Sequence, residues 1–536
     1  MTIKSLLTTC LSLIIITGCS KTEERPNILL IVADDLGYAD LGVHGSRIQT
    51  PHLDTLAQQG VLFSQFHTAP MCAPTRAMLL SGNNNHVAGM GSQLPNTKLD
   101  GTPGFEHELS DRIATMPNVM KSAGYHTYMV GKWHLGSDLS NNPYQAGFER
   151  SFALDDGGGN HFDGRGFMPY PSKYFEDDHL ADWPEGAYST NFYTDKLIEF
   201  LNTDKTSDQP FFIYAAYTSP HWPLQVPDAE LDRYKGAYDE GYEALRIENL
   251  NNLKQAGLIS QEQGLPELDP SVVPWADLSS EEQKIESRKM ELYAAMVSNL
   301  DDNIGRLLAH LKQIGKLDNT LVVFMSDNGA APSDLYNRGP FVKSVRSKYD
   351  NNVFEDLGKA NSFVSYGVAW AEAGSAPFKY YKTKTTEGGV RAPLIISGAA
   401  VKAHPDISHA YLTVMDLAPT FYRLAGAAYP AGKAPLLGSS ITDVLAGSAD
   451  TVHNDDYITV LDHNNDALVR QGNWKLHSTD SFSENSFALY NLLDDPTEST
   501  DVKTQHPEIY QRLLDAWQEK TKAYGIVEIP DRLIMK

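Results

Sequence analysis

Cysteine is scarce in this chain, which has 536 residues but only Cys10, Cys19 and Cys72. The first two lie in an N-terminal segment with the layout of an export signal, so Cys72 is a lone thiol in the mature protein. A fold stapled by disulfide bonds is therefore excluded. Because a lone cysteine usually fills an apolar core, the residues around Cys72 decide whether it has a chemical role.

Positive charge and long apolar runs are also in short supply. The chain has 44 Lys and Arg against 68 Asp and Glu, a formal net charge of −24. A field of that sign disfavours nucleic acid and extended polyanions as partners, so a small anion would need a local basic pocket. The longest apolar run near the N-terminus, Leu6 to Ile16, is too short for a stable membrane span. The overall composition, 41% apolar and 21% charged, is ordinary for a globular enzyme, and the length favours two domains.

The N-terminus predicts export and lipidation. Lys4 followed by the apolar run 6–16 has the layout of a secretory signal. Ile16-Thr17-Gly18-Cys19 resembles a bacterial lipobox, which would make residues 1–18 a lipoprotein signal peptide, Cys19 the lipidated first residue and residues 19–26 a polar tether. The alternative is an ordinary signal peptide cleaved nearby. Because Ser20 rather than Asp follows the cysteine, we expect a bacterial cell-envelope protein on the periplasmic side of the outer membrane of a Gram-negative host, touching the membrane through its lipid anchor only.

Buried-strand patterns and helical patterns alternate along most of the chain. This alternation is typical of an α/β sheet with helices on both faces. We expect a large domain over residues 27–430, whose last helix is 414–426, and a small α+β domain over residues 431–536. The predictions for the large domain are strands at 27–33, 211–217 and 320–325, helices at 53–59, 74–80 and 290–314, and a helix-to-strand unit over 116–130; those for the small domain are strands at 457–461, 474–477 and 488–490 and a helix at 507–524.

Two long segments break the alternation. Residues 141–188 are rich in Gly and aromatic residues, and residues 225–286 are acidic and partly helical. Loops of this length in a compact domain are usually functional covers or rims, so we place substrate selection there.

Two polar pairs come just after predicted buried strands, Asp34-Asp35 and Asp327-Asn328. Ligand sites in parallel sheets form beyond the carboxyl ends of strands, so neighbouring strands would bring three carboxylates and an amide oxygen together. Such hard oxygen donors select Ca²⁺ or Mg²⁺ over zinc. Either pair alone would indicate a turn or a helix cap. Asp301-Asp302 lies inside a helical pattern and is expected to be structural or solvated.

Basic and histidine side chains follow other strand ends. Gly131-Lys132-Trp133-His134 ends a strand, and the i, i+2 spacing predicts Lys132 and His134 on one side of an extended backbone. His221 follows a buried strand in a proline-flanked loop. Lys382 lies just ahead of Glu387-Gly388-Gly389, where Lys384 competes for the same role. These groups could reach one anion.

The residues around Cys72 form a motif. Cys72-Ala73-Pro74-Thr75-Arg76, continued by Leu80-Ser81-Gly82, resembles the signature of type I sulfatases. In that family a dedicated enzyme oxidises the cysteine to Cα-formylglycine. Thr75 stands where many members have Ser, at the variable position of the motif. The pattern predicts Cys72 just before a proline-started helix, with Arg76 one turn along the same face.

The resemblance extends over nearly the whole mature chain, with its segments in the expected order. The match is close in residues 63–91, 131–136 and 219–225. The chain resembles a bacterial arylsulfatase of the formylglycine-dependent sulfatase family, within the alkaline phosphatase-like superfamily. This implies an α/β fold with a large mixed sheet flanked by helices and a smaller C-terminal α+β domain. It also implies that Asp34, Asp35, Asp327, Asn328 and the modified Cys72 hold calcium, and that Arg76, Lys132, His134, His221 and Lys382 surround the sulfate, Lys382 matching the family spacing better than Lys384.

The mechanism that the resemblance implies gives these residues roles. Hydrated formylglycine offers a geminal diol, one hydroxyl of which would attack sulfur with help from calcium and Asp327. The basic side chains around the sulfate would stabilise the spreading negative charge. His221 would protonate the leaving alcohol or phenol, and His134 would take the proton of the second hydroxyl so that sulfate leaves.

The predicted activity is hydrolysis of a small sulfate monoester, with a formylglycine-generating maturation enzyme as a partner. The ester is an aryl, alkyl or sugar sulfate, and a carbohydrate-specific exo-sulfatase is an alternative. A rival within the superfamily is a phosphonate or phosphodiester hydrolase. A rival of another class is a catalytically dead lipoprotein that binds calcium or sulfate. The sequence leaves the substrate group and the oligomeric state open.

Overall fold

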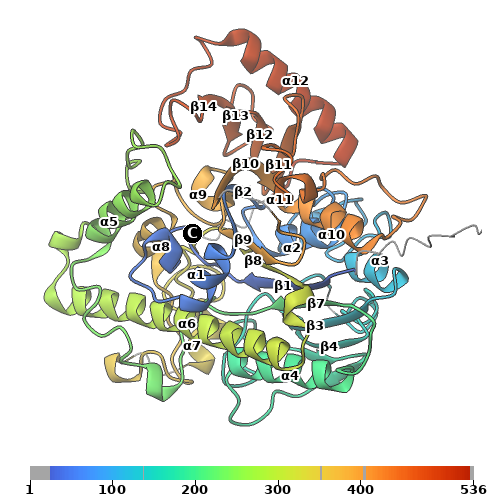
Figure 1. Ribbon diagram of the computed structural model, residues 1–536. Coiled ribbons are helices and arrows are strands. Elements are labelled where there is room, and N and C mark those ends of the chain that lie inside the picture. The colour runs from blue at the N-terminus through green and yellow to red at the C-terminus, as the bar shows by residue number, and fades with distance from the viewer. Residues whose placement is uncertain (1–24, 137, 350–352, 403–405, 531–536) are drawn as a thin grey trace, which may run out of the picture.

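The computed structural model describes residues 25–136, 138–349, 353–402 and 406–530. These residues form a mixed sheet of ten strands and a smaller antiparallel sheet of four strands, drawn at the top of Figure 1. The order in the large sheet is β10-β2-β9-β8-β1-β7-β3-β4-β5-β6, and β9 and β5 run antiparallel to their neighbours. Its strands are β1 (Asn27–Ala33), β2 (Gly60–His67), β3 (His126–Lys132), β4 (Arg150–Leu154), β5 (Tyr174–Glu176), β6 (His179–Ala181), β7 (Phe211–Ala216), β8 (Thr320–Ser326), β9 (Leu394–Gly398) and β10 (Ile407–Thr413).

Strand β1 shows why the first predicted strand is a continuous apolar run. It lies inside the large sheet, paired in parallel with β7 on one side and β8 on the other, and all its residues are buried. Successive side chains enter opposite cores: Leu29 and Ile31 pack on one face, and Ile28 and Leu30 on the other. A strand covered on both faces needs an apolar side chain at every position.

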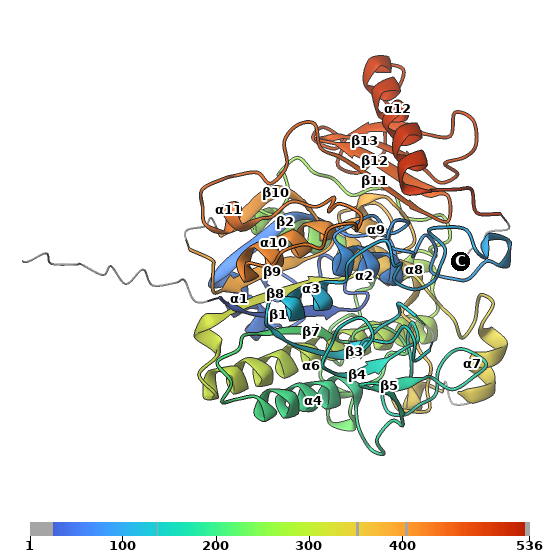
Figure 2. The same cartoon turned by 90° about the vertical axis from the view of Figure 1, so that its right-hand side faces the viewer.

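Helices cover both faces of the large sheet (Figure 2). Helices α1, α4, α5, α6 and α8 pack on one face, and α2, α3, α10 and α11 pack on the other. The predicted helix 290–314 is the C-terminal part of α6, which begins at Ser280 after a capping box of Ser279 and Glu282. The helices are α1 (Pro51–Gln58), α2 (Cys72–Ser81), α3 (Met116–Ser122), α4 (Ser189–Thr203), α5 (Tyr242–Gln255), α6 (Ser280–Gln313), α7 (Val342–Lys348), α8 (Gly367–Ser375), α9 (Glu387–Val390), α10 (Leu417–Ala425), α11 (Thr442–Leu445) and α12 (Pro507–Tyr524).

The small sheet has the order β11-β12-β13-β14, and α12 packs on it. The sequence patterns do not predict β12. A two-residue turn, Asn464-Asn465, joins it to β11, and the φ angles of 55° and 61° in this turn suit asparagine. The large mixed sheet flanked by helices and this smaller C-terminal unit confirm the predicted fold class. The strands are β11 (Ile458–His463), β12 (Asp466–Gln471), β13 (Trp474–Ser478) and β14 (Ala488–Asn491).

The two long segments differ in structure. Residues 141–188 contribute β4, β5 and β6, which extend one edge of the large sheet, so much of this segment is sheet rather than loop. Residues 225–286 contain α5.

Beyond the predicted domain boundary at residue 430, α11 packs into the core of the large sheet through Val444 and Leu445. The boundary itself stays a prediction.

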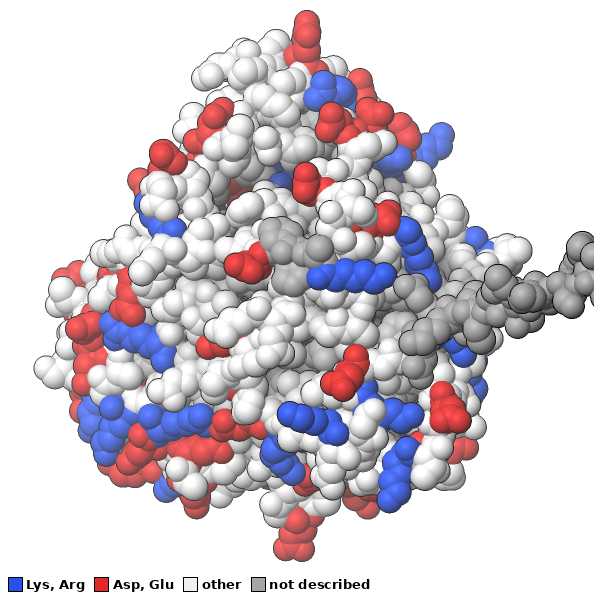
Figure 3. Space-filling model, viewed as in Figure 1, with Lys and Arg blue, Asp and Glu red and all other residues white. Residues whose placement is uncertain are grey.

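Charged side chains of both signs are interspersed on the face seen in Figure 3.

Within the ranges given above, no helix combines the length and the apolar character needed to cross a membrane. The predicted signal peptide, Cys19 and most of the predicted tether lie outside the described residues.

Candidate active site

Two strand ends meet inside the large sheet. Strand β1 pairs with β8 along its whole length, so the residues after both strands leave the sheet side by side. The N–H of Asp35 donates to Asp327 Oδ1 at 3.2 Å, and Asn328 Nδ2 donates to Asp35 Oδ1 at 2.7 Å. Together with Asp34, these residues are buried. The predicted convergence of three carboxylates and an amide is confirmed.

Cys72 lies against this acidic group. It is the first residue of α2, not the residue before the helix as predicted. Its Sγ is 3.4 Å from Asp34 Oδ1, 3.7 Å from Asp35 Oδ1 and 3.0 Å from Lys382 Nζ. Burial, with Asp327 nearby, raises the pKa of the thiol well above its usual value. The unmodified side chain is therefore a neutral thiol at neutral pH and a weak nucleophile.

Three buried carboxylates pair with three cations, so the group is formally neutral. Pairing offsets the cost of burying the charges. The pairs are Lys132 Nζ with the two oxygens of Asp34 at 2.8 and 2.9 Å, Arg76 Nη2 and Nε with Asp327 Oδ2 at 2.8 and 3.0 Å, and Lys382 Nζ with Asp35 Oδ1. These six side chains are called the catalytic cluster below.

Two oxygen acceptors of this site lack a hydrogen-bond donor within the described part of the chain, Asp35 Oδ2 and Asn328 Oδ1. Buried acceptors without partners are rare and costly, so they mark a place for a cation. Asp34, Asp35, Cys72 and His221 each offer a ligand atom, and these atoms all lie within 4.8 Å of one another. The carboxylate and amide oxygens are the donors that Ca²⁺ and Mg²⁺ prefer. The residues present thus fit the predicted hard cation.

His221 faces the acidic group through Nε2, which is 3.4 Å from Asp35 Oδ2. Its Nδ1 lies 2.7 Å from the carbonyl oxygen of Trp222, so Nδ1 carries a proton and donates it. Burial lowers the pKa of His221 well below its usual value, although the Asp35 carboxylate opposes this. Gly158 permits close packing, because a Cβ there would lie 2.8 Å from Cε1 of the ring. Nε2 is held where it can exchange a proton with a bound group.

His134 lies beyond the end of β3 in a left-handed backbone conformation, with φ of 57°. The extended backbone ends at Lys132, so the predicted i, i+2 arrangement on one side of a strand is wrong. The ring still belongs to the site: burial, and then the charges of Lys132 and Arg76, lower its pKa well below the usual value. Gly157 packs against it, since a Cβ there would lie 2.6 Å from Cε1 of His134.

Three neighbours that the sequence patterns do not single out hold these groups in place. Arg76 Nη1 donates to the hydroxyl of Tyr214 at 3.4 Å. His161 Nε2 lies 3.0 Å from the carbonyl oxygen of His221. The third is the run Gly157-Gly158-Gly159, and this run is the one sequence signal that could have indicated a close approach.

These contacts decide two open choices. Lys384 lies 3.7 Å from Asp466, whereas Lys382 contacts Cys72, so Lys382 is the lysine of the site. Asp301 accepts two backbone N–H groups at the start of α1, at 2.8 and 3.1 Å. It is therefore structural, as predicted.

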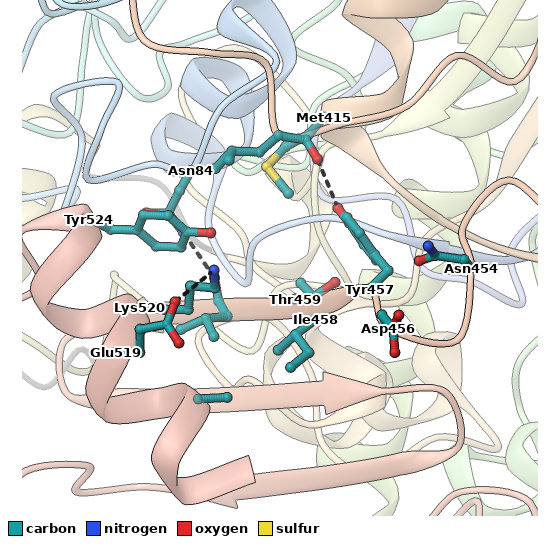
Figure 4. A pocket seen from close by; sticks show the side chains of 13 residues that line it. Asn84, Met415, Asn454, Asp456, Tyr457, Ile458, Thr459, Glu519, Lys520 and Tyr524 are labelled. Atoms are coloured by element: carbon teal, nitrogen blue, oxygen red, sulfur yellow. Dashed lines mark hydrogen bonds and ion pairs between the residues drawn. The ribbon is translucent and has the colours of Figure 1, made fainter. Parts of the chain in front are cut away.

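A cavity of about 570 Å³ adjoins the site and is lined by Met71 and Thr383, the chain neighbours of Cys72 and Lys382. It is called the outer cavity below. A second cavity, of about 390 Å³, lies between α12 and β11, where Tyr457 lines it (Figure 4). None of the predicted site residues lines the second cavity.

A second buried group of charges joins the two sheets. Lys475 Nζ is 2.9 Å from Glu387 Oε1 and 2.8 Å from Glu498 Oε1. His67 Nε2 is 2.9 Å from Glu387 Oε2, and Arg470 Nη1 is 3.6 Å from the same oxygen. Although burial opposes it, these partners, led by Lys475, hold the pKa of Glu387 well below its usual value. These five residues are called the Glu387 cluster below.

Comparison with known proteins points to one family. The model of the sulfatase family matches residues 26–427. An uncharacterized sulfatase of Schizosaccharomyces pombe is 38% identical over 537 residues, which cover 96% of this chain and 96% of that protein. The arylsulfatase of Klebsiella aerogenes is 39% identical over 435 residues, which cover 79% of this chain and 92% of that enzyme. The crystal structure of Ps i-CgsB has a TM-score of 0.66 and 24% identity, with 93% of each chain covered, which shows a shared fold.

Proposed function

Because the chain belongs to the sulfatase family and is a sulfuric ester hydrolase, we propose that it cleaves small sulfate monoesters with a formylglycine made from Cys72 and with a bound Ca²⁺. The observation that carries the proposal is the setting of Cys72. Its Sγ contacts Asp34, Asp35 and Lys382, beside the unpaired acceptors Asp35 Oδ2 and Asn328 Oδ1. Mg²⁺ would fit the same donors.

The thiol of Cys72 is unsuited to this chemistry. It is buried, and its raised pKa keeps it neutral. A hydrated aldehyde at the same position has two hydroxyl groups, one to attack sulfur and one whose deprotonation lets sulfate leave. The proposal therefore includes a maturation enzyme that oxidises the cysteine.

A cation suits the charge balance of the site. Asp34, Asp35, Asp327 and Asn328 would hold it through oxygen atoms. Bound there, Ca²⁺ would favour loss of a proton from the attacking hydroxyl and polarise a sulfate oxygen. Since the catalytic cluster is neutral by itself, a divalent cation leaves two positive charges. These match one negative charge on a sulfate monoester and one on a deprotonated hydroxyl.

Each basic side chain has a role in this proposal. Lys132, Lys382 and Arg76 donate to the reacting oxygens and stabilise the charge that spreads over them. Nε2 of His221 faces the site, takes up a proton when the anionic substrate is bound, and gives that proton to the leaving oxygen. His134 takes the proton of the second hydroxyl.

Matched nitrophenyl esters test the proposal. We expect protein with verified formylglycine to cleave 4-nitrophenyl sulfate at least about 100-fold more efficiently than 4-nitrophenyl phosphate, a nitrophenyl phosphonate or bis(4-nitrophenyl) phosphate. A phosphate monoester carries nearly two negative charges and fits the site's charge less well. Preferred cleavage of the phosphodiester or the phosphonate would assign the site to the rival hydrolase. Sulfate binding without turnover of any ester would support a catalytically dead binding protein.

We also propose, from the lipobox at residues 16–19, that the protein is anchored in the bacterial envelope through Cys19. Mature bacterial lipoproteins carry more than one acyl chain, which gives stable anchoring. Wild-type protein is then expected in the membrane fraction of a Gram-negative host, and Cys19→Ala in the soluble fraction. Equal release of both forms would contradict the anchor.

A further inference from the structure

Most residues that line the outer cavity are polar or charged. Its walls come from segments far apart in the chain: residues 332–340, residues 269 and 271 of the second long segment, and the hairpin between β11 and β12. Cavities that bind aromatic compounds are lined mainly by apolar side chains with a few polar groups. Many polar side chains in a wall that also exposes apolar atoms favour a ligand with several hydroxyl groups on an apolar ring.

His463, at the end of β11, is a buried polar group in this wall without a full set of partners. It lines the cavity, and its exposed fraction is 2%. Its Nε2 lies 3.2 Å from Asn464 Nδ2 and accepts that hydrogen bond, so the proton of the neutral ring is on Nδ1. Within the described ranges, Nδ1 has no hydrogen-bond partner. A buried donor without an acceptor indicates an oxygen atom supplied by a ligand.

The hairpin that carries His463 is tied to the rest of the protein. Asn465, in the turn, accepts from the N–H of Ile529 at 2.8 Å, and its carbonyl accepts from the N–H of Ser481 at 2.8 Å. Asp466 accepts from the N–H of Thr385 at 2.9 Å. Since Thr385 follows Lys382 by three residues, these bonds hold His463 in a defined position relative to the catalytic lysine.

The cavity wall also carries a net negative charge. Asp269, Asp334, Asp466 and Asp480 line it, against the cations Lys384 and Arg338. A further sulfate group on the ligand would meet these carboxylates and be repelled. A ligand that is neutral apart from its scissile sulfate would not be.

We propose that the outer cavity binds the alcohol part of the substrate, that this alcohol is a neutral sugar with a single sulfate, and that His463 Nδ1 donates to a sugar oxygen near the ester. The proposal rests on the sulfatase function proposed above. Tyr381 and Leu94 offer apolar surface to the CH groups of the sugar ring. His463 contacts the leaving group and determines specificity, without taking part in bond cleavage.

Two substitutions of His463 separate hydrogen bonding from packing. His463→Phe keeps an aromatic ring and removes the donor, whereas His463→Gln keeps a donor. The probes are methyl glycosides with one sulfate at O2, O3, O4 or O6, and 4-nitrophenyl sulfate. The leaving group of 4-nitrophenyl sulfate has no sugar hydroxyl that could accept a hydrogen bond from His463. We expect wild-type protein to cleave at least one glycoside sulfate. His463→Phe should lower kcat/KM for it about 10–100-fold and change that for 4-nitrophenyl sulfate less than about 3-fold, with partial recovery in His463→Gln.

A control variant and a disulfated substrate complete the test of the proposal. His506→Ala, an exposed histidine of the small unit that packs on Trp474, is the matched control and should leave both rates unchanged. A second sulfate on the preferred glycoside should lower kcat/KM at least about 10-fold. Equal losses on both substrate types in His463→Phe and His463→Gln would overturn the proposal, as would cleavage of 4-nitrophenyl sulfate without cleavage of any glycoside. If wild-type protein fails on 4-nitrophenyl sulfate and on every glycoside, the sulfatase function itself is wrong.

Discussion

The catalytic cluster and the Glu387 cluster are both buried groups of carboxylates and cations that join distant parts of the chain. They differ in what lies next to the carboxylates. Glu498 Oε1 of the Glu387 cluster also lacks a hydrogen-bond donor, but it forms an ion pair with Lys475 at 2.8 Å. In the Glu387 cluster both oxygens of Glu387 have partners, Lys475 and His67. Beside the catalytic cluster, Asp35 Oδ2 and Asn328 Oδ1 have no donor within the described ranges, and Cys72 contacts Asp35. Burial and charge do not by themselves mark an active site, whereas unpaired acceptors next to a reactive group do.

Replacing Cys72 should cause the largest loss of activity among the variants of the two clusters. Cys72→Ala removes the proposed site of formylglycine, so kcat for 4-nitrophenyl sulfate should fall at least about 10⁴-fold. The melting temperature should change little, because the substitution removes a single buried atom. Mass spectrometry of the peptide containing Cys72 should find the aldehyde in active wild-type protein. Substantial activity in Cys72→Ala would end the proposed mechanism.

Removal of divalent metal should affect the catalytic cluster and leave the Glu387 cluster unchanged. Chelation should abolish activity, and Ca²⁺ or Mg²⁺ should restore it. A ligand bound only by the folded state at 100 times its Kd contributes about 2.7 kcal/mol to the free energy of unfolding, so the melting temperature should fall on chelation. The Asp327→Asn variant should lose this metal-dependent shift, and Lys475→Met should keep it. Full activity after exhaustive chelation would contradict a metal site.

The two histidines of the site should respond differently to the leaving group. His221→Ala removes the proposed general acid, which is typically worth about 10²–10⁴-fold, and the loss shrinks when the leaving group is already a weak base. Steady-state rates should therefore fall far more for alkyl or sugar sulfates than for 4-nitrophenyl sulfate. His134→Ala should slow sulfate release by a factor independent of the leaving group. The same factor on both substrate types for His221→Ala would make His221 a sulfate-binding residue instead.

Breaking the Glu387 cluster should change stability and leave catalysis nearly intact. Lys475→Met removes one partner of a buried carboxylate, which typically costs about 3–5 kcal/mol in the free energy of unfolding. Activity per folded molecule should stay within about 3-fold of wild type. A large loss of activity at unchanged stability would show that the Glu387 cluster serves catalysis and not stability.

The same variant has a pH signature. Because the folded state lowers the pKa of Glu387 below its usual value of 4.5, the stabilisation is present above that value and is lost as the pH falls below it. Lys475→Met should flatten this acid dependence. Urea unfolding at pH 7 and pH 4 measures both effects, and an unchanged acid slope would show that Lys475 does not hold the pKa of Glu387.

Polar residues at strand ends made much of the site predictable from the sequence. Such residues, just after buried apolar runs, converge wherever the strands are neighbours, and β1 and β8 are neighbours. This pattern alone predicts that Asp34, Asp35, Asp327 and Asn328 lie together. The apolar pattern likewise predicts the central strands β1, β3, β7 and β8, because burial on both faces of a sheet leaves a strong signal.

Other parts of the site depend on pairings that a sequence pattern does not carry. His134 has a left-handed backbone conformation and packs against Gly157, whereas the i, i+2 rule assumes an extended backbone. The hairpin that brings His463 to the outer cavity contains β12, which has Arg470 and Asp466 in a short strand. Its Asp466 meets Thr385, a contact across 81 residues. Local propensity does not encode such contacts.

The order of the site residues along the chain determines how long Cys72 stays accessible to the proposed maturation enzyme during synthesis. Lys382, which contacts Cys72 in the folded protein, lies 310 residues further along the chain, and its contact with Asp35 spans 347 residues. At a synthesis rate of about 5–20 residues per second, Lys382 is made roughly 15–60 s after Cys72. Throughout that interval the strands and loop that bury Cys72 are incomplete, and the thiol is open to a modifying enzyme. Once β8 and the loop of Lys382 are in place, the exposed fraction of Cys72 is 1%. Under the proposed mechanism, a chain that folds before Cys72 is oxidised would stay inactive until it unfolds again.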